Sequence, residues 1–180
     1  MRALLRLSAA IDAANEWIGR TAAWLGLAAV LVCTVNAIFR YTVNLSSNAW
    51  LELQWYLNAA VFMLVAAWAL KRNDHVRIDV IFGKFSHRVQ AWIDIFGGVL
   101  ALLPASCIIA WYSWPSLLSA YSISEYSSDP GGLIRWPMRL LIPIAFTLLA
   151  LQGVSEIIKR VAFLRGLIAF PAGQHRQEPA

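Results

Sequence analysis

Four long apolar blocks, separated by short charged stretches, constrain this chain more than any other feature. They lie at residues 21–39, 50–70, 92–118 and 136–158. Each is close to or longer than the roughly 20 residues that a helix needs to cross about 30 Å of hydrocarbon. In the whole chain 59% of residues are hydrophobic and 14% are charged, whereas an average soluble domain is about 25% charged. The sequence therefore predicts an all-α integral membrane protein with four transmembrane helices.

The distribution of positive charge predicts how these helices are oriented. Lys and Arg in short loops beside membrane spans are retained on the cytoplasmic side. Of the 15 Lys and Arg residues, 12 lie in residues 1–20, 71–91 and 159–180, and the others lie in or beside residues 40–49 and 119–135. We therefore expect a multi-pass membrane protein. Both termini and the 71–91 loop should be cytoplasmic, and the other two loops should lie on the opposite side of the membrane.

Two segments beside the spans are amphipathic. Their apolar side chains recur at three- and four-residue steps, as on one face of a helix. These side chains are Leu4, Leu7, Ile11, Ala14 and Ile18 in residues 1–20, and Ile81, Phe85, Val89, Trp92 and Phe96 in and after residues 71–91. We expect two interfacial helices lying along the cytoplasmic membrane surface, the second of which runs into the third span.

The third apolar block contains two prolines, Pro104 and Pro115. Proline removes a backbone donor and kinks helices, although neighbouring helices can satisfy the freed groups. We therefore expect a tilted or kinked third helix that ends near Pro115.

The polar residues argue against several function classes. The net charge of +5 is divided among segments that flank the spans, which is typical of topogenic and lipid-contacting charge and not of a nucleic-acid interface. A membrane haem protein needs axial ligands at membrane depth, whereas His75, His87 and His175 all lie outside the predicted spans.

Ion-coupled carriers usually keep an ionisable group deep in the bundle. Here every charged residue in a span lies within about two turns of an end, so any moving part of a transporter should be in another chain.

The stretch KRNDHVRIDV at residues 71–80 holds the densest group of polar residues. Asp74, His75 and Asp79 could in principle bind a divalent metal. However, no second histidine or carboxylate cluster stands at a recognised ligand spacing. We interpret the stretch as a solvated turn with helix-capping aspartates, and we expect no metal, cofactor or catalytic residue in this chain.

Polar residues near the span ends are candidates for structural contacts. Arg40 and Glu52 could pair across the hairpin between the first two spans, or could be two independent interfacial charges. Gln152 and Glu156 share a helix face, on which Glu156 can reach the basic residues at 159 and 160. This pattern favours neutralisation of the Glu156 charge by these neighbouring basic residues at the cytoplasmic end of the span. The alternative is that the helix face that carries Gln152 binds another helix.

Three runs of residues, taken together, resemble one known family. They are SSNAWLELQWYLNAAVF, LKRNDHVRIDV and GGLIRWPMRLLIPIAFTLLALQGVSEIIKR. From about Arg40 to Arg165 the chain resembles the small, Q-type (DctQ-like) membrane subunit of tripartite ATP-independent periplasmic (TRAP) transporters. In detail its sequence is most similar to the mannitol/chloroaromatic-compound branch of this family. This similarity implies a 2-oxo acid or another organic acid as the substrate.

The resemblance implies a division of labour. In such transporters a large membrane subunit carries the sodium sites, the substrate site and the elevator-like movement, and a secreted binding protein captures the substrate in the periplasm. The small subunit packs against the stationary scaffold of the large one. It would itself hold no cofactor, and the sodium would bind to the large subunit.

The resemblance also assigns structural or interface roles by position. The matching residues are Trp50 and Glu52 at the start of the second span, His75 and Asp79 in the cytoplasmic turn, and Gly131, Gly132, Trp136 and Pro137 at the outer start of the fourth span. Many relatives have two consecutive acidic residues near Glu52, whereas in this chain Leu53 follows Glu52. A role that depends on two adjacent acidic residues is therefore not assigned to this chain.

The combined expectation is a small permease subunit of the bacterial inner membrane, with residues 40–49 and 119–135 in the periplasm, that supports sodium-coupled, binding-protein-dependent uptake of an organic acid. Its expected partners are the large permease subunit, a periplasmic substrate-binding protein and membrane lipids, but not nucleic acid. The alternative is a free-standing structural or assembly protein of the membrane without a transport role, and a small autonomous channel comes third.

Overall fold

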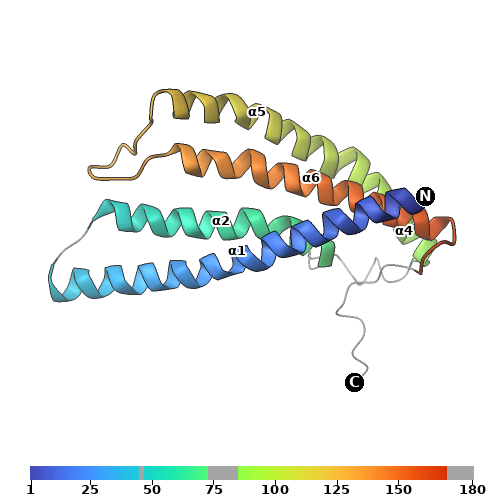
Figure 1. Ribbon diagram of the computed structural model, residues 1–180, viewed down its shortest axis with the longest axis horizontal. Helices are drawn as coiled ribbons and strands as arrows, with labels where there is room; N and C mark the ends of the chain where they lie inside the picture. The colour runs from blue at the N-terminus through green and yellow to red at the C-terminus, as the bar shows by residue number, and fades with distance from the viewer. Residues whose placement is uncertain (45–46, 73–84, 170–180) are drawn as a thin grey trace, which may run out of the picture.

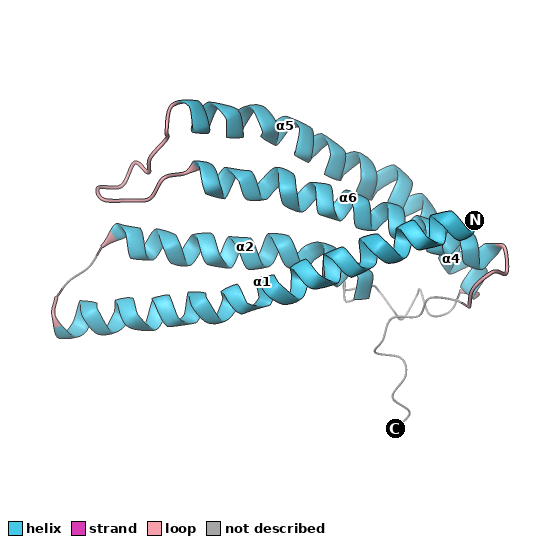
Figure 2. Cartoon of the chain, viewed as in Figure 1, coloured by secondary structure: helices cyan, strands magenta, loops and turns pink. Residues whose placement is uncertain are grey.

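The computed structural model describes residues 1–44, 47–72 and 85–169, and within these ranges the chain is helical apart from short connections (Figure 2). The helices are α1 (Arg2–Thr42), α2 (Asn48–Arg72), α4 (His87–Gly97), α5 (Leu103–Ser122) and α6 (Trp136–Leu164), with a π-helical turn at Gly98–Leu102 between α4 and α5. Four stretches are long and apolar enough to cross a membrane: Arg2–Thr42, Asn48–Arg72, His87–Ser122 and Trp136–Leu164. The predicted all-α membrane fold with four spans is confirmed, and the orientation of its termini stays a prediction.

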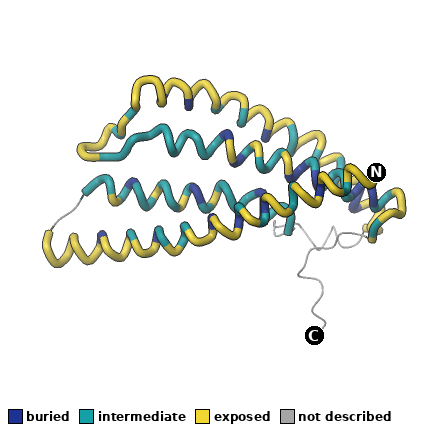
Figure 3. Tube along the Cα trace, viewed as in Figure 1, coloured by how far each residue is buried: buried dark blue, intermediate teal, exposed yellow. Residues whose placement is uncertain are grey.

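The four spans lie side by side in an open layer (Figure 1). The order across the layer is α5, α6, α2, α1, and the most extensive contacts join α1 to α2, α2 to α6 and α6 to α5. The edge helices α1 and α5 are exposed over most of their length (Figure 3). The buried apolar residues are nearly all alanines, including Ala67, Ala91 and Ala120. Because small side chains let helix backbones approach closely, the helices contact along narrow seams and leave their larger apolar side chains on the outside.

Helix α1 is continuous over 41 residues, which makes it about 60 Å long at 1.5 Å per residue. The predicted surface helix over residues 1–20 and the predicted span over residues 21–39 are thus parts of one helix, and which part of α1 lies in the membrane stays a prediction. The N-terminal half of α1 crosses α6 (Figure 1) and buries the polar residues Ser8 and Asn15, whereas Leu4 and Leu7 of the predicted apolar stripe are exposed. The physical reason is that these polar side chains find hydrogen-bond partners on α6.

Close contact between α1 and α2 depends on Gly19. A β carbon at this position would lie 2.6 Å from the Cβ of Trp68, which is shorter than van der Waals contact allows. Glycine is therefore needed where these two helices meet.

The third span also differs from its prediction. The helix continues through Pro115 to Ser122, where Leu117 and Ala120 are buried, and does not end near Pro115. The irregularity lies earlier, in the π-helical turn just before Pro104. Pro104 has no N–H to donate to the carbonyl four residues earlier, and a wider π turn accommodates such a break in the hydrogen-bond ladder.

Helices α4 and α6 extend the spans at the end of the layer where α1 begins (Figure 1). Residues 73–84, which include most of the predicted 71–91 loop, lie outside the described residues. Helix α4 then runs into the third span as expected, with Phe85, Val89, Trp92 and Phe96 exposed. Helix α6 continues past the predicted end at residue 158 to Leu164, because its last charged residues pair with acids on α1 and α4.

Candidate functional site

The connection between α5 and α6 folds back onto the start of α2 around Glu52, which is only 5% exposed. The Ser127 hydroxyl and the backbone N–H of Leu133 both donate to its carboxylate, the latter at 2.6 Å. A β carbon on Gly132 would lie 2.7 Å from Glu52 Oε1, so only glycine fits beside this carboxylate. We call Glu52, Ser127, Gly132 and Leu133 the loop cluster, and it fixes the 123–135 connection against α2.

Arg40 does not take part in this cluster. It is exposed in the last turn of α1 and makes no ion pair with any residue in the described ranges. Of the two interpretations of Arg40 and Glu52, the ion pair is wrong and the two independent charges remain. The reason is that donors from the α5–α6 connection satisfy the Glu52 carboxylate.

Further hydrogen bonds hold the connection on both sides. Asn48 and Tyr56 of α2 donate to loop carbonyls at 3.0 and 3.3 Å. Arg139 of α6 donates to Glu125 at 2.6 Å and to the hydroxyl of Ser116 on α5 at 2.8 Å. The backbone N–H of Glu125 also donates to the carbonyl of Ala120 on α5 at 2.9 Å, so the connection is fastened to three helices.

The other motif residues at this end have local structural roles. Gly131 has a φ of +73°, in the left-handed region that favours glycine. Pro137 stands in the first turn of α6, where the absence of an N–H costs no helix hydrogen bond. The Trp136 ring packs edge-to-face on Tyr121 with centroids 5.7 Å apart, and Trp50 is half-exposed in the first turn of α2.

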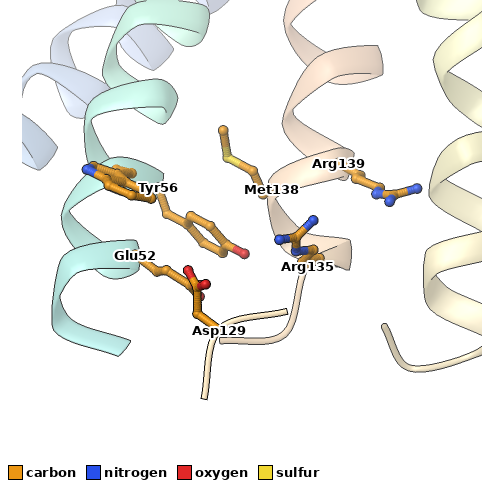
Figure 4. Close-up of a pocket in the computed structure, with 7 residues that line it drawn as sticks. Glu52, Tyr56, Asp129, Arg135, Met138 and Arg139 are labelled. Atoms are coloured by element: carbon orange, nitrogen blue, oxygen red, sulfur yellow. The ribbon is translucent and has the colours of Figure 1, made fainter. Parts of the chain in front are cut away.

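A pocket of about 250 Å³ lies between α2 and α6 beside the connection (Figure 4). Tyr56 and Arg135 reach toward one another across it in Figure 4, with Glu52 and Asp129 nearer the connection. The full lining is Glu52, Trp55, Tyr56, Asp129, Arg135, Met138 and Arg139. The pocket thus combines aromatic and apolar walls with charges of both signs.

A second polar cluster lies at the other end of the layer, where α1 crosses α6. Gln152 is fully buried, donates to Asp12 at 2.8 Å and accepts from Asn15 at 2.7 Å. Ser155 donates to Asp12 at 2.6 Å, and Lys159 pairs with the same carboxylate at 3.0 Å. We call this the helix cluster, and its members are Ser8, Asp12, Asn15, Gln152, Ser155 and Lys159.

The partners of Asp12 complement a carboxylate. Ser155 and Gln152 donate hydrogen bonds to it, and the ammonium group of Lys159 supplies the opposite charge. Glu156 accepts from Lys159 at 2.5 Å and from Gln152 at 3.1 Å. The Gln152 face therefore contacts another helix, α1, while Glu156 has the local neutralisation that the sequence suggested.

Sequence reasoning missed most members of the two clusters. Ser8, Asp12, Asn15 and Gly19 recur at four- and three-residue steps, and this small and polar stripe was the available signal for helix packing. Ser127 gave no signal, because its partner Glu52 lies 75 residues away in the sequence. His75 and Asp79 lie outside the described residues.

One exposed stripe on α2 combines apolar and polar side chains. Trp55, Asn58 and Phe62 follow one another at steps of three and four residues, and Phe62 is 82% exposed. Asn58 is exposed and makes no hydrogen bond with a described residue. It lies eight residues beyond Trp50, about 12 Å into the span at 1.5 Å per residue, where an unpaired amide in contact with lipid is unfavourable. We call these three residues the α2 stripe.

Comparison with protein families gives a match over residues 6–163 to the family described as "Tripartite ATP-independent periplasmic transporters, DctQ component". A search of curated proteins finds none that matches the chain.

Proposed function

The chain belongs to the DctQ family of TRAP transporters and is a small permease subunit of the inner membrane, and from this premise we propose that it packs against the large permease subunit through the α2 stripe. In this arrangement it supports sodium-coupled uptake of an organic acid delivered by a periplasmic substrate-binding protein. The family itself implies association with these two partners.

The observation that carries this proposal is the exposed amide of Asn58 between two large aromatic side chains. Lipid tails offer no hydrogen-bond partner, whereas a helix of another membrane protein does. Phe62 is exposed one turn after Asn58, and their helix, α2, lies in the middle of the layer (Figure 1). Aromatic side chains near the centre of an interface contribute most of the binding energy, so this position suits the large subunit.

The positions of the charged residues support placing ion and substrate binding on the large subunit. Within the predicted spans 21–39, 50–70, 92–118 and 136–158 the charged residues lie within about two turns of an end. The polar groups of the loop cluster, and likewise those of the helix cluster, bond to one another. The middle of the spans is left with apolar side chains and amides, which suit a supporting role. The organic-acid substrate follows from the resemblance to the mannitol/chloroaromatic-compound branch.

Coexpression with a large TRAP permease tests the docking. Phe62→Ala should lower the amount of copurified large subunit about tenfold, as for a central aromatic contact, and Asn58→Leu about threefold, as for one hydrogen bond in a membrane. Ile108→Ala is the matched control, because Ile108 is also exposed but lies on the edge helix α5. Equal copurification of all three variants with the large subunit would overturn docking through the α2 stripe.

Reconstitution tests the transport role. Proteoliposomes that hold both membrane subunits should take up an organic acid only with the binding protein and a sodium gradient. Proteoliposomes that hold this chain alone should show no uptake. Uptake by this chain alone would instead favour the autonomous channel, and failure of the unmodified chain to copurify with any large permease would favour the free-standing assembly protein.

A further inference from the structure

The pocket between α2 and α6 contains one acidic and one basic side chain, Asp129 and Arg135, that form no ion pair with any described residue. Asp129 makes no ion pair there, and the Arg135 guanidinium has a single long hydrogen bond, 3.4 Å from Ser128 Oγ. Both side chains line the pocket. The other charged lining residues are engaged, because Glu52 accepts bonds from the loop cluster and Arg139 pairs with Glu125.

The pocket lies where two predicted spans begin. Its α2 residues stand in the second and third turns of that helix and its α6 residues in the first turn, at the starts of the predicted spans 50–70 and 136–158. Trp50 and Trp136 come two residues before Glu52 and Met138, and tryptophan is enriched where phospholipid headgroups meet the hydrocarbon. The remaining walls are Trp55, Tyr56 and Met138, which offer an apolar surface beside the charges.

We propose that this pocket binds the headgroup of an aminophospholipid of the phosphatidylethanolamine type. Arg135 donates hydrogen bonds to the phosphate, and the primary ammonium donates to the carboxylate of Asp129. One acyl chain lies against Trp55 and Met138. The pocket then matches a zwitterion, with one cation for the anionic group and one anion for the cationic group.

Other lipid classes fit these charges less well. Phosphatidylglycerol offers Arg135 the same phosphate, but its headgroup ends in neutral hydroxyls and not in an ammonium, so Asp129 is left without a cation. Phosphatidylcholine carries a quaternary ammonium that has no N–H to donate to Asp129. The proposal requires only that the chain is in a membrane, so it stands or falls independently of docking to the large subunit.

Native mass spectrometry of the purified full chain, incubated in turn with phosphatidylethanolamine, phosphatidylglycerol and phosphatidylcholine, tests the site. The unmodified chain should retain phosphatidylethanolamine preferentially. Arg135→Gln should lower its retention about tenfold, the factor expected for the loss of a charge-assisted hydrogen bond. Arg40→Gln is the control, because Arg40 is a cation at the same end of the layer that lies outside the pocket.

The second variant, Asp129→Asn, separates recognition of the ammonium from recognition of the phosphate. It should abolish the preference for phosphatidylethanolamine over phosphatidylcholine while retention of phosphatidylglycerol stays or rises. Inorganic phosphate at millimolar concentration should displace little lipid, since it offers no acyl chain. Equal retention of phosphatidylethanolamine by the unmodified chain, Arg135→Gln and Arg40→Gln overturns the proposal. An unchanged lipid preference in Asp129→Asn also overturns the proposal. This second variant keeps the test valid if Arg135→Gln fails to fold.

Discussion

At the scale of single residues, Glu52 illustrates how a charged motif residue in a membrane helix can act within its own chain. Its carboxylate faces inward and accepts hydrogen bonds from Ser127 and from the Leu133 backbone. The sequence pointed to Glu52 as important, but it could not identify these partners. They stand on a connection whose path depends on contacts with three helices, and such long-range contacts leave no local periodicity.

Glu52→Gln should loosen the 123–135 connection. The neutral amide keeps the shape of the side chain but accepts a weaker hydrogen bond than a carboxylate does. Backbone amide exchange at Leu133 should therefore become about three- to tenfold faster, as measured by hydrogen exchange with mass spectrometry. Glu156→Gln makes the same chemical change beside the helix cluster, at the other end of the layer, and should leave exchange at Leu133 unchanged. Identical exchange in both variants would contradict the assigned role of Glu52.

At the scale of elements, the sequence located the helices better than it located their faces. The steps from Leu4 to Ile18 predicted a helix correctly, because helical periodicity is a local property. The same stripe was interpreted as the face that lies on a membrane surface, yet protein packing involves an adjacent face, about a quarter turn away, where Ser8 and Asn15 are buried. Which face meets another helix depends on partners such as Gln152 and Ser155, 137 or more residues away in the sequence.

A double-cysteine variant, Ser8→Cys with Ser155→Cys, tests the crossing of α1 over α6. The two hydroxyl oxygens are 2.7 Å apart, which brings the side chains within disulfide range. In a background with Cys33→Ala and Cys107→Ala, mild oxidation in membranes should cross-link most of the chain and shift its mobility on a non-reducing gel. Ser8→Cys with Ser119→Cys should not cross-link, because Ser119 lies near the end of α5, beside the loop cluster. Equal cross-linking of the two pairs would restore the surface-helix interpretation.

At the scale of the whole molecule, the four spans were predictable and their arrangement was not. Apolar length alone is enough to identify a membrane helix. The order α5, α6, α2, α1 follows instead from seams of small residues such as Ala67, Ala120 and Gly19, and nothing in the length or composition of a span shows which neighbour it meets. The apolar residues that marked the spans most clearly, such as Trp24 and Phe62, are mostly outside these seams.

The orientation of the layer remains a prediction with a direct test. Reporter fusions after Asn44 and Ser127 should show periplasmic activity, and a fusion after Lys84 should show cytoplasmic activity. The physical reason is the retention of positively charged flanks in the cytoplasm. Substitution of Lys71, Arg72, Arg77, Lys84 and Arg88 by Gln should weaken this bias and give a mixed population. A periplasmic signal from the Lys84 fusion in the unmodified chain would contradict the orientation.

The open layer also has a mechanical consequence. A helix with its side chains is about 10 Å across, and away from the crossing of α1 over α6 the layer is one helix thick, so no interior separates its two broad sides there. A partner that pushes on one broad side therefore moves the same helix backbones that form the other side, because no separate core lies between the two sides. Neighbouring helices are joined along their lengths, which makes the molecule stiff within its own plane. Across that plane it is a thin plate, and bending is its softest deformation.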